Sequence, residues 1–334
     1  MAAVPPDGLC FQGGFFMRPQ LECVVREVEK AIVGKRPVIE RILTAMLAEG
    51  HVLLDDVPGV GKTTLAVAIS RAIGLAFQRV QFTPDVLPSD LVGFSMYEKA
   101  SGEWLYRPGA LNSANLILGD EINRASSKTQ SALLEAMEER QITVDGKTYP
   151  LQTPFLVIAT ENSVGTAGTQ LLPYAQLDRF LVKLSLGYPD YEAQMTMLRG
   201  RQTADPLETV ARVTDRDELL AMQREVRAVT VRDAVLDYIT RLTFASREHP
   251  AVEVGVSPRG ALFLCRTAKA KAYLEGRDYV TGGDVQDVLT DVCRHRVLLK
   301  ESVRETTAAQ VLEELLKKVE NPDRRGLFAG MKKP

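Results

Sequence analysis

A glycine-rich segment that runs into a lysine and a threonine carries the clearest chemical signal in this sequence. It follows a short apolar run and reads Asp56-Val57-Pro58-Gly59-Val60-Gly61-Lys62-Thr63-Thr64. Glycines let backbone N–H groups turn inward around phosphate oxygens, a lysine at the helix start neutralises the β and γ phosphates, and a following hydroxyl binds Mg²⁺. We therefore predict a phosphate-binding loop, with Thr63 also a magnesium ligand. Its predicted nucleotide-binding residues are Pro58, Gly59, Val60, Gly61, Lys62, Thr63 and Thr64.

One position of this loop departs from the usual pattern. The phosphate-binding pattern begins with glycine, and Asp56 stands at that place. Its negative charge would repel the phosphates if the side chain pointed into the loop. The tripeptide Gly-Lys-Thr also occurs by chance in chains of ordinary composition. The prediction therefore depends on the placement of the loop between a predicted strand and a predicted helix.

Two carboxylates follow a second apolar run. Leu116 to Gly119 has the pattern of a buried strand, and Asp120 and Glu121 come directly after it. This is typical of a Walker B element, in which Asp120 reaches the magnesium shell and Glu121 faces the water that attacks the γ-phosphate. An acidic turn after a strand is the alternative. Asn162 ends the next predicted strand and is expected to orient the attacking water, although asparagine there is often only a turn residue.

Strands and helices alternate in the first part of the chain. Short apolar runs predict buried strands at residues 51–55, 77–82, 116–119, 155–160 and 180–186. Helical spacing of the apolar residues between them implies crossover helices and a parallel sheet covered on both faces. After Pro189 the strand patterns disappear and the periodicity is helical. The helices predicted there are at 192–201, 216–228, 232–247, 259–275, 283–298 and 306–320.

The predicted fold class is therefore α/β, with a P-loop parallel-sheet domain followed by an all-helical domain. Two short tails are expected to flank them. The expected boundaries are a loose N-terminal tail over 1–20, the α/β domain over 21–189, the helical domain over 190–320 and a C-terminal tail over 321–334.

The bulk composition is that of an ordinary globular protein. Apolar residues make up 45%, charged residues 25%, and the formal net charge is −2, which gives no general reason to expect nucleic-acid binding. No apolar run is long enough to span a membrane, and no signal peptide is expected. Cys10, Cys23, Cys265 and Cys293 lack Cys-x-x-Cys pairing and zinc-ligand spacing, so we expect reduced thiols in a cytoplasmic protein.

Several longer motifs together resemble the MoxR family of AAA+ ATPases. They read Gly-Asp-Glu-Ile-Asn-Arg-Ala at 119–125, Lys-Thr-Gln-Ser-Ala-Leu-Leu-Glu-Ala-Met at 128–137, Gln-Phe-Thr-Pro-Asp at 81–85, Pro-Ser-Asp at 88–90 and Ala-Gln-Leu-Asp-Arg-Phe at 175–180. The resemblance runs from about Ile32 to Pro189 and again from Ser257 to His295. It implies ATP and Mg²⁺ as cofactors, a helical lid, and a homo-oligomeric ring, expected to be a hexamer, with ATP at the subunit interfaces.

The resemblance also implies roles for residues outside the loop. Arg179 looks like the arginine finger that reaches the ATP of a neighbouring subunit, and Arg259 looks like the sensor 2 arginine of the lid. A residue that caps a strand and a solvated residue at a helix start are the respective alternatives. The segments 98–107 and 141–151 look like the helix-2 insert hairpin and the pre-sensor-1 hairpin, which project toward the ring pore in this clade.

Two further positions depart from the family pattern. Ser163 replaces a proline, and Tyr174 replaces a glutamate in the segment before Arg179. The second change bears on the details of the subunit interface.

The resemblance favours a chaperone-like ATPase that remodels or matures partner proteins, often proteins with von Willebrand factor A domains and with metal insertion. The ATPase subunit of a magnesium chelatase is a close variant of this reading. A nucleic-acid motor of the same insert clade is the alternative, but both hairpins carry mixed charges rather than excess positive charge. A non-hydrolysing scaffold is disfavoured because Lys62, Asp120, Glu121 and Arg179 are all present.

Overall fold

A computed structural model describes residues 17–161, 172–202, 205–303 and 306–323. Its centre is a five-stranded sheet in the order β2-β5-β8-β1-β9, and each neighbouring pair in that sheet is parallel. The strands are β1 (Val52–Asp55), β2 (Phe77–Gln81), β5 (Leu116–Asp120), β8 (Leu156–Glu161) and β9 (Val182–Leu184). The five predicted strands and the parallel sheet are thereby confirmed.

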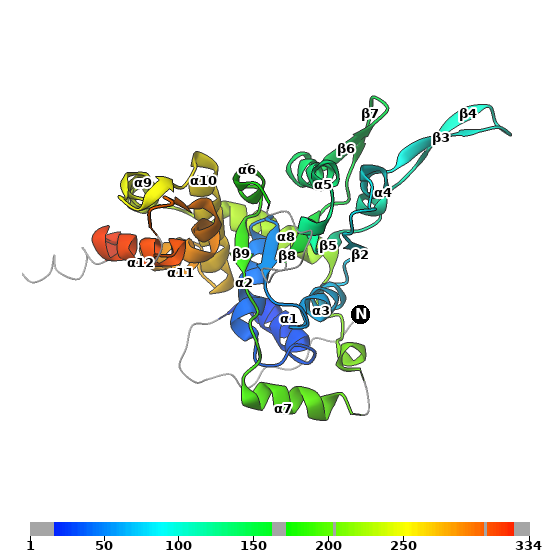
Figure 1. The fold of residues 1–334 in the computed structure, drawn as a ribbon. Coiled ribbons are helices and arrows are strands. Elements are labelled where there is room, and N and C mark those ends of the chain that lie inside the picture. The colour runs from blue at the N-terminus through cyan, green and yellow to red at the C-terminus, as the bar shows by residue number, and fades with distance from the viewer. Residues whose placement is uncertain (1–16, 162–171, 203–204, 304–305, 324–334) are drawn as a thin grey trace, which may run out of the picture.

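Helices cover both faces of this sheet (Figure 1) because its inner strands are apolar on both sides. In β1, Val52 and Leu54 belong to one hydrophobic core and Leu53 belongs to another. Successive side chains of a strand point to opposite faces, so two covered faces require nearly continuous apolar strands. The first core contains residues of α1 (Pro19–Glu29), α2 (Arg36–Leu47) and α3 (Lys62–Ile73), and it continues into the helices after β9. The second core contains residues of α4 (Pro88–Val92) and α5 (Ser127–Glu139).

The chain after β9 is mostly helical, as predicted, but it also contains a small antiparallel ribbon. In this ribbon β10 (Val252–Val254) pairs with β11 (Leu298–Leu299). The helix predicted at 283–298 consequently ends earlier, at Cys293, and the ribbon was missed because its strands are too short to show alternation. The remaining helices are α6 (Tyr174–Leu177), α7 (Tyr191–Gly200), α8 (Arg216–Ala228), α9 (Asp233–Glu248), α10 (Pro258–Leu274), α11 (Gly282–Cys293) and α12 (Ala308–Lys318). Single 3₁₀ turns are η1 (Ala110–Asn112), η2 (Ile122–Arg124), η3 (Pro206–Thr209) and η4 (Arg294–Arg296).

The sequence led us to expect reduced cysteines and no membrane-spanning segment. Cys23, Cys265 and Cys293 are free thiols, and burial raises the pKa of the Cys293 thiol to about 12. Cys10 lies outside the described residues. Across the described ranges, no helix combines the length and the apolar character needed to cross a membrane.

Two antiparallel hairpins project from the α/β part (Figure 1). The first consists of β3 (Phe94–Glu98) and β4 (Glu103–Arg107), and the second of β6 (Gln141–Val144) and β7 (Lys147–Pro150). Both were predicted, although the first begins at Phe94 rather than at Glu98. The rings of Tyr106 and Tyr149 stack with their centroids 4.0 Å apart, so each hairpin supports the other.

A fully buried arginine joins the helical part to the sheet. The side chain of Arg296, in η4, is 0% exposed, and its Nε donates to Asp178 Oδ1 at 2.8 Å. Its terminal nitrogens donate to the backbone carbonyls of Asp178, Phe180 and Leu181, just before β9. Ser257, at the start of α10, donates to the same Asp178 carboxylate at 3.1 Å. These hydrogen bonds fix the helical part against the segment that leads into β9.

Replacing Arg296 by methionine should lower the free energy of unfolding by about 3–5 kcal/mol, because the largely buried Asp178 carboxylate would lose its cation. Urea unfolding followed by circular dichroism measures this loss as a lower midpoint. Arg294→Met is the matched control, because Arg294 Nε has no hydrogen-bond partner within the described residues. Equal midpoints for the two variants would contradict the role assigned to Arg296.

Candidate nucleotide-binding site

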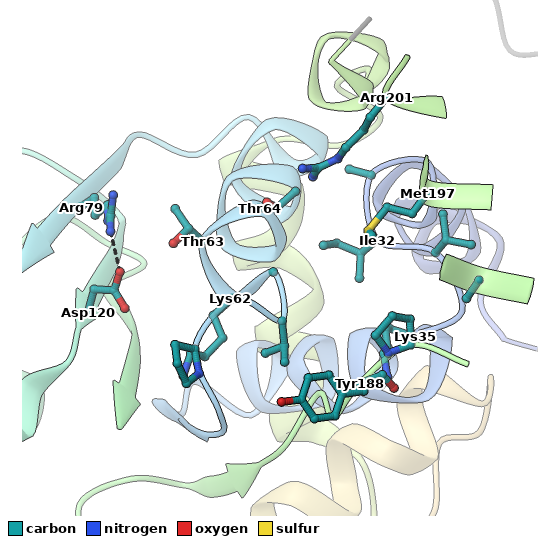
Figure 2. A pocket seen from close by; sticks show the side chains of 18 of the residues that line it. Ile32, Lys35, Lys62, Thr63, Thr64, Arg79, Asp120, Tyr188, Met197 and Arg201 are labelled. Atoms are coloured by element: carbon teal, nitrogen blue, oxygen red, sulfur yellow. Dashed lines mark hydrogen bonds and ion pairs between the residues drawn. The ribbon is translucent and has the colours of Figure 1, made fainter. Parts of the chain in front are cut away.

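The predicted phosphate-binding loop connects β1 to α3 and lines a cavity of about 490 Å³ (Figure 2). Gly59 and Gly61 have φ angles of 84° and 98°, a left-handed conformation that side chains with a Cβ avoid. Because α3 begins at Lys62, its first N–H groups and the positive end of its dipole face this cavity. All of the predicted loop residues from Pro58 to Thr64 line it. This arrangement can bind an anion such as a nucleotide phosphate.

The buried Lys62 side chain is part of the cavity lining. Its Nζ donates to the carbonyl oxygens of Asp56 at 2.9 Å and Glu161 at 3.3 Å. The pKa of the Lys62 amine is lowered, mainly because burial disfavours the charged form, while nearby carboxylates including Asp56 and Asp120 oppose that effect. A buried ammonium group bound to neutral carbonyls gains strongly from an incoming phosphate oxygen.

Asp56 does not point into the phosphate-binding loop. Its Oδ2 accepts hydrogen bonds from the Ser185 hydroxyl at 3.0 Å, from the Gly187 N–H at 2.9 Å and from the Leu186 N–H. The carboxylate is therefore turned toward the segment that follows β9 and is absent from the cavity lining. The repulsion of phosphates considered from the sequence does not apply, and Asp56 instead ties the start of the loop to that segment.

The carboxylates at the end of β5 lie where the sequence predicts them, on the wall of the same cavity. Asp120 Oδ1 accepts a hydrogen bond from the Thr160 hydroxyl at 2.7 Å, and that hydroxyl accepts one from the Glu121 N–H at 2.8 Å. Glu121 has a φ angle of 58°, which is unusual for a residue with a side chain and typical of functional sites. One hydroxyl at the end of β8 thus fixes both acidic residues.

Two arginines of this site were missed by sequence reasoning. Arg79, on β2, donates from a terminal nitrogen to Asp120 Oδ2 at 2.7 Å (Figure 2), and Arg124 pairs with Glu121 Oε2 at 2.8 Å. Arg124 stands three residues after Glu121, a spacing that could have suggested the pair. Arg79 gave no such signal, because its contact depends on the pairing of β2 with β5.

The residues at this end of the cavity fit a magnesium ion. The Thr63 hydroxyl and the carboxylates of Asp120 and Glu121 all line it, and magnesium prefers oxygen ligands while keeping several waters. Over the described ranges there is no cluster of three or more His, Cys, Asp or Glu side chains that could hold a metal without further ligands. Thr63 and Asp120 would therefore hold the ion together with water and phosphate oxygens.

The opposite side of the cavity is more apolar. Figure 2 shows Ile32, Met197 and Tyr188 on that side, away from Arg79 and Asp120, together with the cations Lys35 and Arg201. Apolar side chains on one side of a cavity and a phosphate-binding loop on the other suit a planar ring attached to a charged chain, as in a nucleotide.

Arg179 and Arg259 do not line this cavity. They meet at a second cavity of about 210 Å³, where both bind the Glu138 carboxylate. The structure therefore brings the loop, Asp120 and Glu121 together at one cavity. It places Arg179 and Arg259, the two predicted arginines, at the other cavity. Asn162, predicted to orient the attacking water, lies outside the described residues.

Tyr174, another departure from the family pattern, has a specific hydrogen-bond partner in the structure. The Tyr174 hydroxyl donates to the backbone carbonyl of Arg296, at the junction between the helical part and the sheet. A carboxylate could not donate this hydrogen bond, so tyrosine has a structural reason to stand here. Ser163 lies outside the described residues.

Comparison with known proteins agrees with this geometry. The family model for the ATPase family associated with various cellular activities (AAA) matches residues 51–182, and that for the AAA lid domain matches residues 244–315. The chain is 44% identical to YeaC of Bacillus subtilis over 92% of this chain and 97% of that protein. It is 40% identical to Chaperone MoxR1 of Mycobacterium tuberculosis over 84% of this chain and 76% of that one.

The solved structures give the same result. The structure described as a candidate ATPase from Cytophaga hutchinsonii matches with a TM-score of 0.83 and 37% identity, covering 90% of this chain and 94% of that chain. The two family matches fall on the α/β part and on the helical lid, and the relatives are similar over most of their length. This chain therefore belongs to the MoxR family of AAA+ ATPases.

Proposed function

We propose that this chain hydrolyses ATP with magnesium at the interfaces between identical subunits of a ring, which the family resemblance suggests is a hexamer. The observation that supports the proposal is the separation of two sets of residues within one chain. The cavity beside Lys62 has the phosphate-binding loop and both carboxylates, whereas Arg179 and Arg259 line a different cavity. A neighbouring subunit would complete the site by supplying these arginines.

Each part of the composite site has a distinct task in this proposal. The loop N–H groups and Lys62 bind the β and γ phosphates, and Glu121 accepts a proton from the attacking water that Asn162 orients. Magnesium, when held by Thr63 and Asp120, offsets charge on the phosphate oxygens. Arg179 and Arg259 of the neighbour stabilise the charge that develops on the γ-phosphate during hydrolysis.

The work driven by hydrolysis is proposed to be chaperone-like remodelling or maturation of a partner protein. The name of the relative Chaperone MoxR1 supports this reading. So does the β3–β4 hairpin, whose projecting strands expose apolar side chains that suit contact with a protein. These are Phe94 at 51%, Met96 at 41%, Tyr97 at 49% and Trp104 at 68%. A partner with a von Willebrand factor A domain, metal insertion and a cytoplasmic location are further parts of the proposal that rest on the resemblance alone.

A nucleic-acid motor is not favoured by this hairpin. Glu98 and Glu103 lie directly opposite each other across its strands, next to the turn. With Lys99 in the turn between them, the tip carries mixed charges and no excess positive charge, whereas binding of a phosphate backbone depends mainly on lysine and arginine.

Glu121→Gln should bind ATP with the parent affinity but hydrolyse it about 10²–10⁴-fold more slowly, because the group that accepts the proton is lost. Isothermal calorimetry measures the affinity, and single-turnover hydrolysis measures the rate. Glu135→Gln, an exposed position on α5, is the control and should behave as the parent does. Hydrolysis at the parent rate by Glu121→Gln would exclude Glu121 as the catalytic carboxylate.

Arg179→Ala and Lys62→Ala should each be nearly inactive alone, and mixing the two proteins should restore part of the activity. Some interfaces of a mixed ring would combine the intact Arg179 of one subunit with the intact loop of its neighbour, and such an arginine accounts for about 10³–10⁵ in rate. Steady-state ATPase assays before and after mixing give the result. No recovery, in samples shown to contain mixed rings, would mean that Arg179 does not act across the interface.

Trp104 is the single tryptophan of the chain, so its fluorescence reports directly on the hairpin. A tryptophan-free apolar peptide should shift this emission to shorter wavelength, because the exposed indole becomes covered, whereas a polythymidine oligonucleotide should not. Trp104→Ala should abolish any stimulation of ATPase activity by the peptide and leave the basal rate unchanged. A shift with the oligonucleotide alone would support the nucleic-acid motor instead.

A further inference from the structure

One carboxylate joins the two arginines that the proposed interface needs. Glu138 lies near the end of α5, and its Oε2 accepts a hydrogen bond from Arg179 Nε at 3.0 Å. Its Oε1 accepts a hydrogen bond from a terminal nitrogen of Arg259, in the first turn of α10. Arg179 belongs to the segment before β9, and Arg259 belongs to the lid. Glu138 therefore connects the α/β part to the lid at the point where the two guanidinium groups come together.

The geometry leaves both arginines able to bind a phosphate. A guanidinium group has five N–H donors in a rigid plane and binds oxyanions through pairs of them. Arg179 uses its Nε on Glu138, and Arg259 uses one terminal nitrogen. The side chains of Arg179 and Arg259 are 30% and 38% exposed, so their other donors are accessible at the mouth of the second cavity.

The surroundings explain why a carboxylate is needed here. Arg140 and Arg266 line the same cavity, and positive charges so close together repel one another. Burial is the main cause that lowers the pKa of Arg266, Glu49 opposes this effect, and Arg140 and Arg227 lower the pKa further. Glu49 also lines this cavity, but it pairs with Arg140 and Arg227. Glu138 is the carboxylate that pairs with Arg179 and Arg259, and without it these two side chains would separate from the cluster and from each other.

We propose that Glu138 is a positioning residue, which holds Arg179 and Arg259 side by side as a two-arginine receptor for the γ-phosphate of the neighbouring subunit's ATP. This inference rests on the proposed function, because it requires that the arginines act across an interface. It adds that the lid arginine and the finger arginine work as one unit, and that the carboxylate of α5 is the part that unites them.

The experiment compares Glu138→Ala and Glu138→Gln with the control Glu139→Ala, the exposed adjacent residue of the same helix. In Glu138→Ala the kcat should fall roughly 10²-fold while the ATP dissociation constant stays within about twofold, because the arginines are misplaced but the loop is intact. Glu138→Gln should recover part of the kcat, since its amide oxygen still accepts a hydrogen bond. Glu139→Ala should retain the parent kcat.

Subunit mixing separates positioning from general damage to the fold. Glu138→Ala mixed with Lys62→Ala should regain activity, because the two changes affect opposite sides of an interface. Glu138→Ala mixed with Arg179→Ala should not, because both affect the side that supplies the arginines. If Glu138→Ala shows a lowered thermal midpoint, the same two mixtures are made with Glu138→Gln.

The outcomes distinguish this inference from the proposed function. Failure of the Arg179→Ala and Lys62→Ala pair to recover, in proven mixed rings, would overturn the shared site itself and with it the role of Glu138. Recovery of that pair, together with a parent kcat in Glu138→Ala or with recovery in its mixture with Arg179→Ala, would overturn the inference alone. A raised ATP dissociation constant with an unchanged kcat would also overturn it, since positioning across the interface predicts the reverse.

Discussion

The positions of Arg179 and Arg259 depend on the largely buried ion pair between Arg296 and Asp178. Arg179 follows Asp178 directly in the chain, and Arg259 lies two residues after Ser257, whose hydroxyl also binds the Asp178 carboxylate. Separating a buried ion pair leaves an uncompensated charge in a medium of low polarity, so its two members move together or not at all. The lid is thereby held against the sheet at the place where the two arginines meet.

Residues with no role predicted from the sequence hold the acidic side chains of the phosphate-binding cavity in place. The Thr160 hydroxyl fixes the adjacent acidic residues Asp120 and Glu121, and Arg79 and Arg124 each pair with one of them. The side chains around this pair therefore hold both acidic residues in place within one subunit.

The residues proposed to act in hydrolysis lie at two separate cavities. One has the loop, the lysine and the carboxylates, and the other has a cluster of arginines around Glu138. Because both sets occur in every copy of the chain, the ring proposed here would contain complete sites only at its interfaces. Such an arrangement links hydrolysis to assembly, and through the lid it would also link hydrolysis to movement between subunits.

The sequence by itself determined the features whose signals are local in the chain. The phosphate-binding loop and the buried strands each depend on neighbouring residues, so both were predicted close to their observed positions. The family motifs pointed to Arg179 and Arg259, but not to the carboxylate that both of them bind.

Only the tertiary structure decided which partners the charged side chains take. Arg79 reaches Asp120 because β2 pairs with β5, and Arg296 is buried because it meets Asp178, 118 positions away. In the sequence both arginines resemble ordinary solvated charges, and so does Glu138. Ion pairs are made by strand order and by the packing of distant segments, and no periodicity along the chain encodes which segments come into contact.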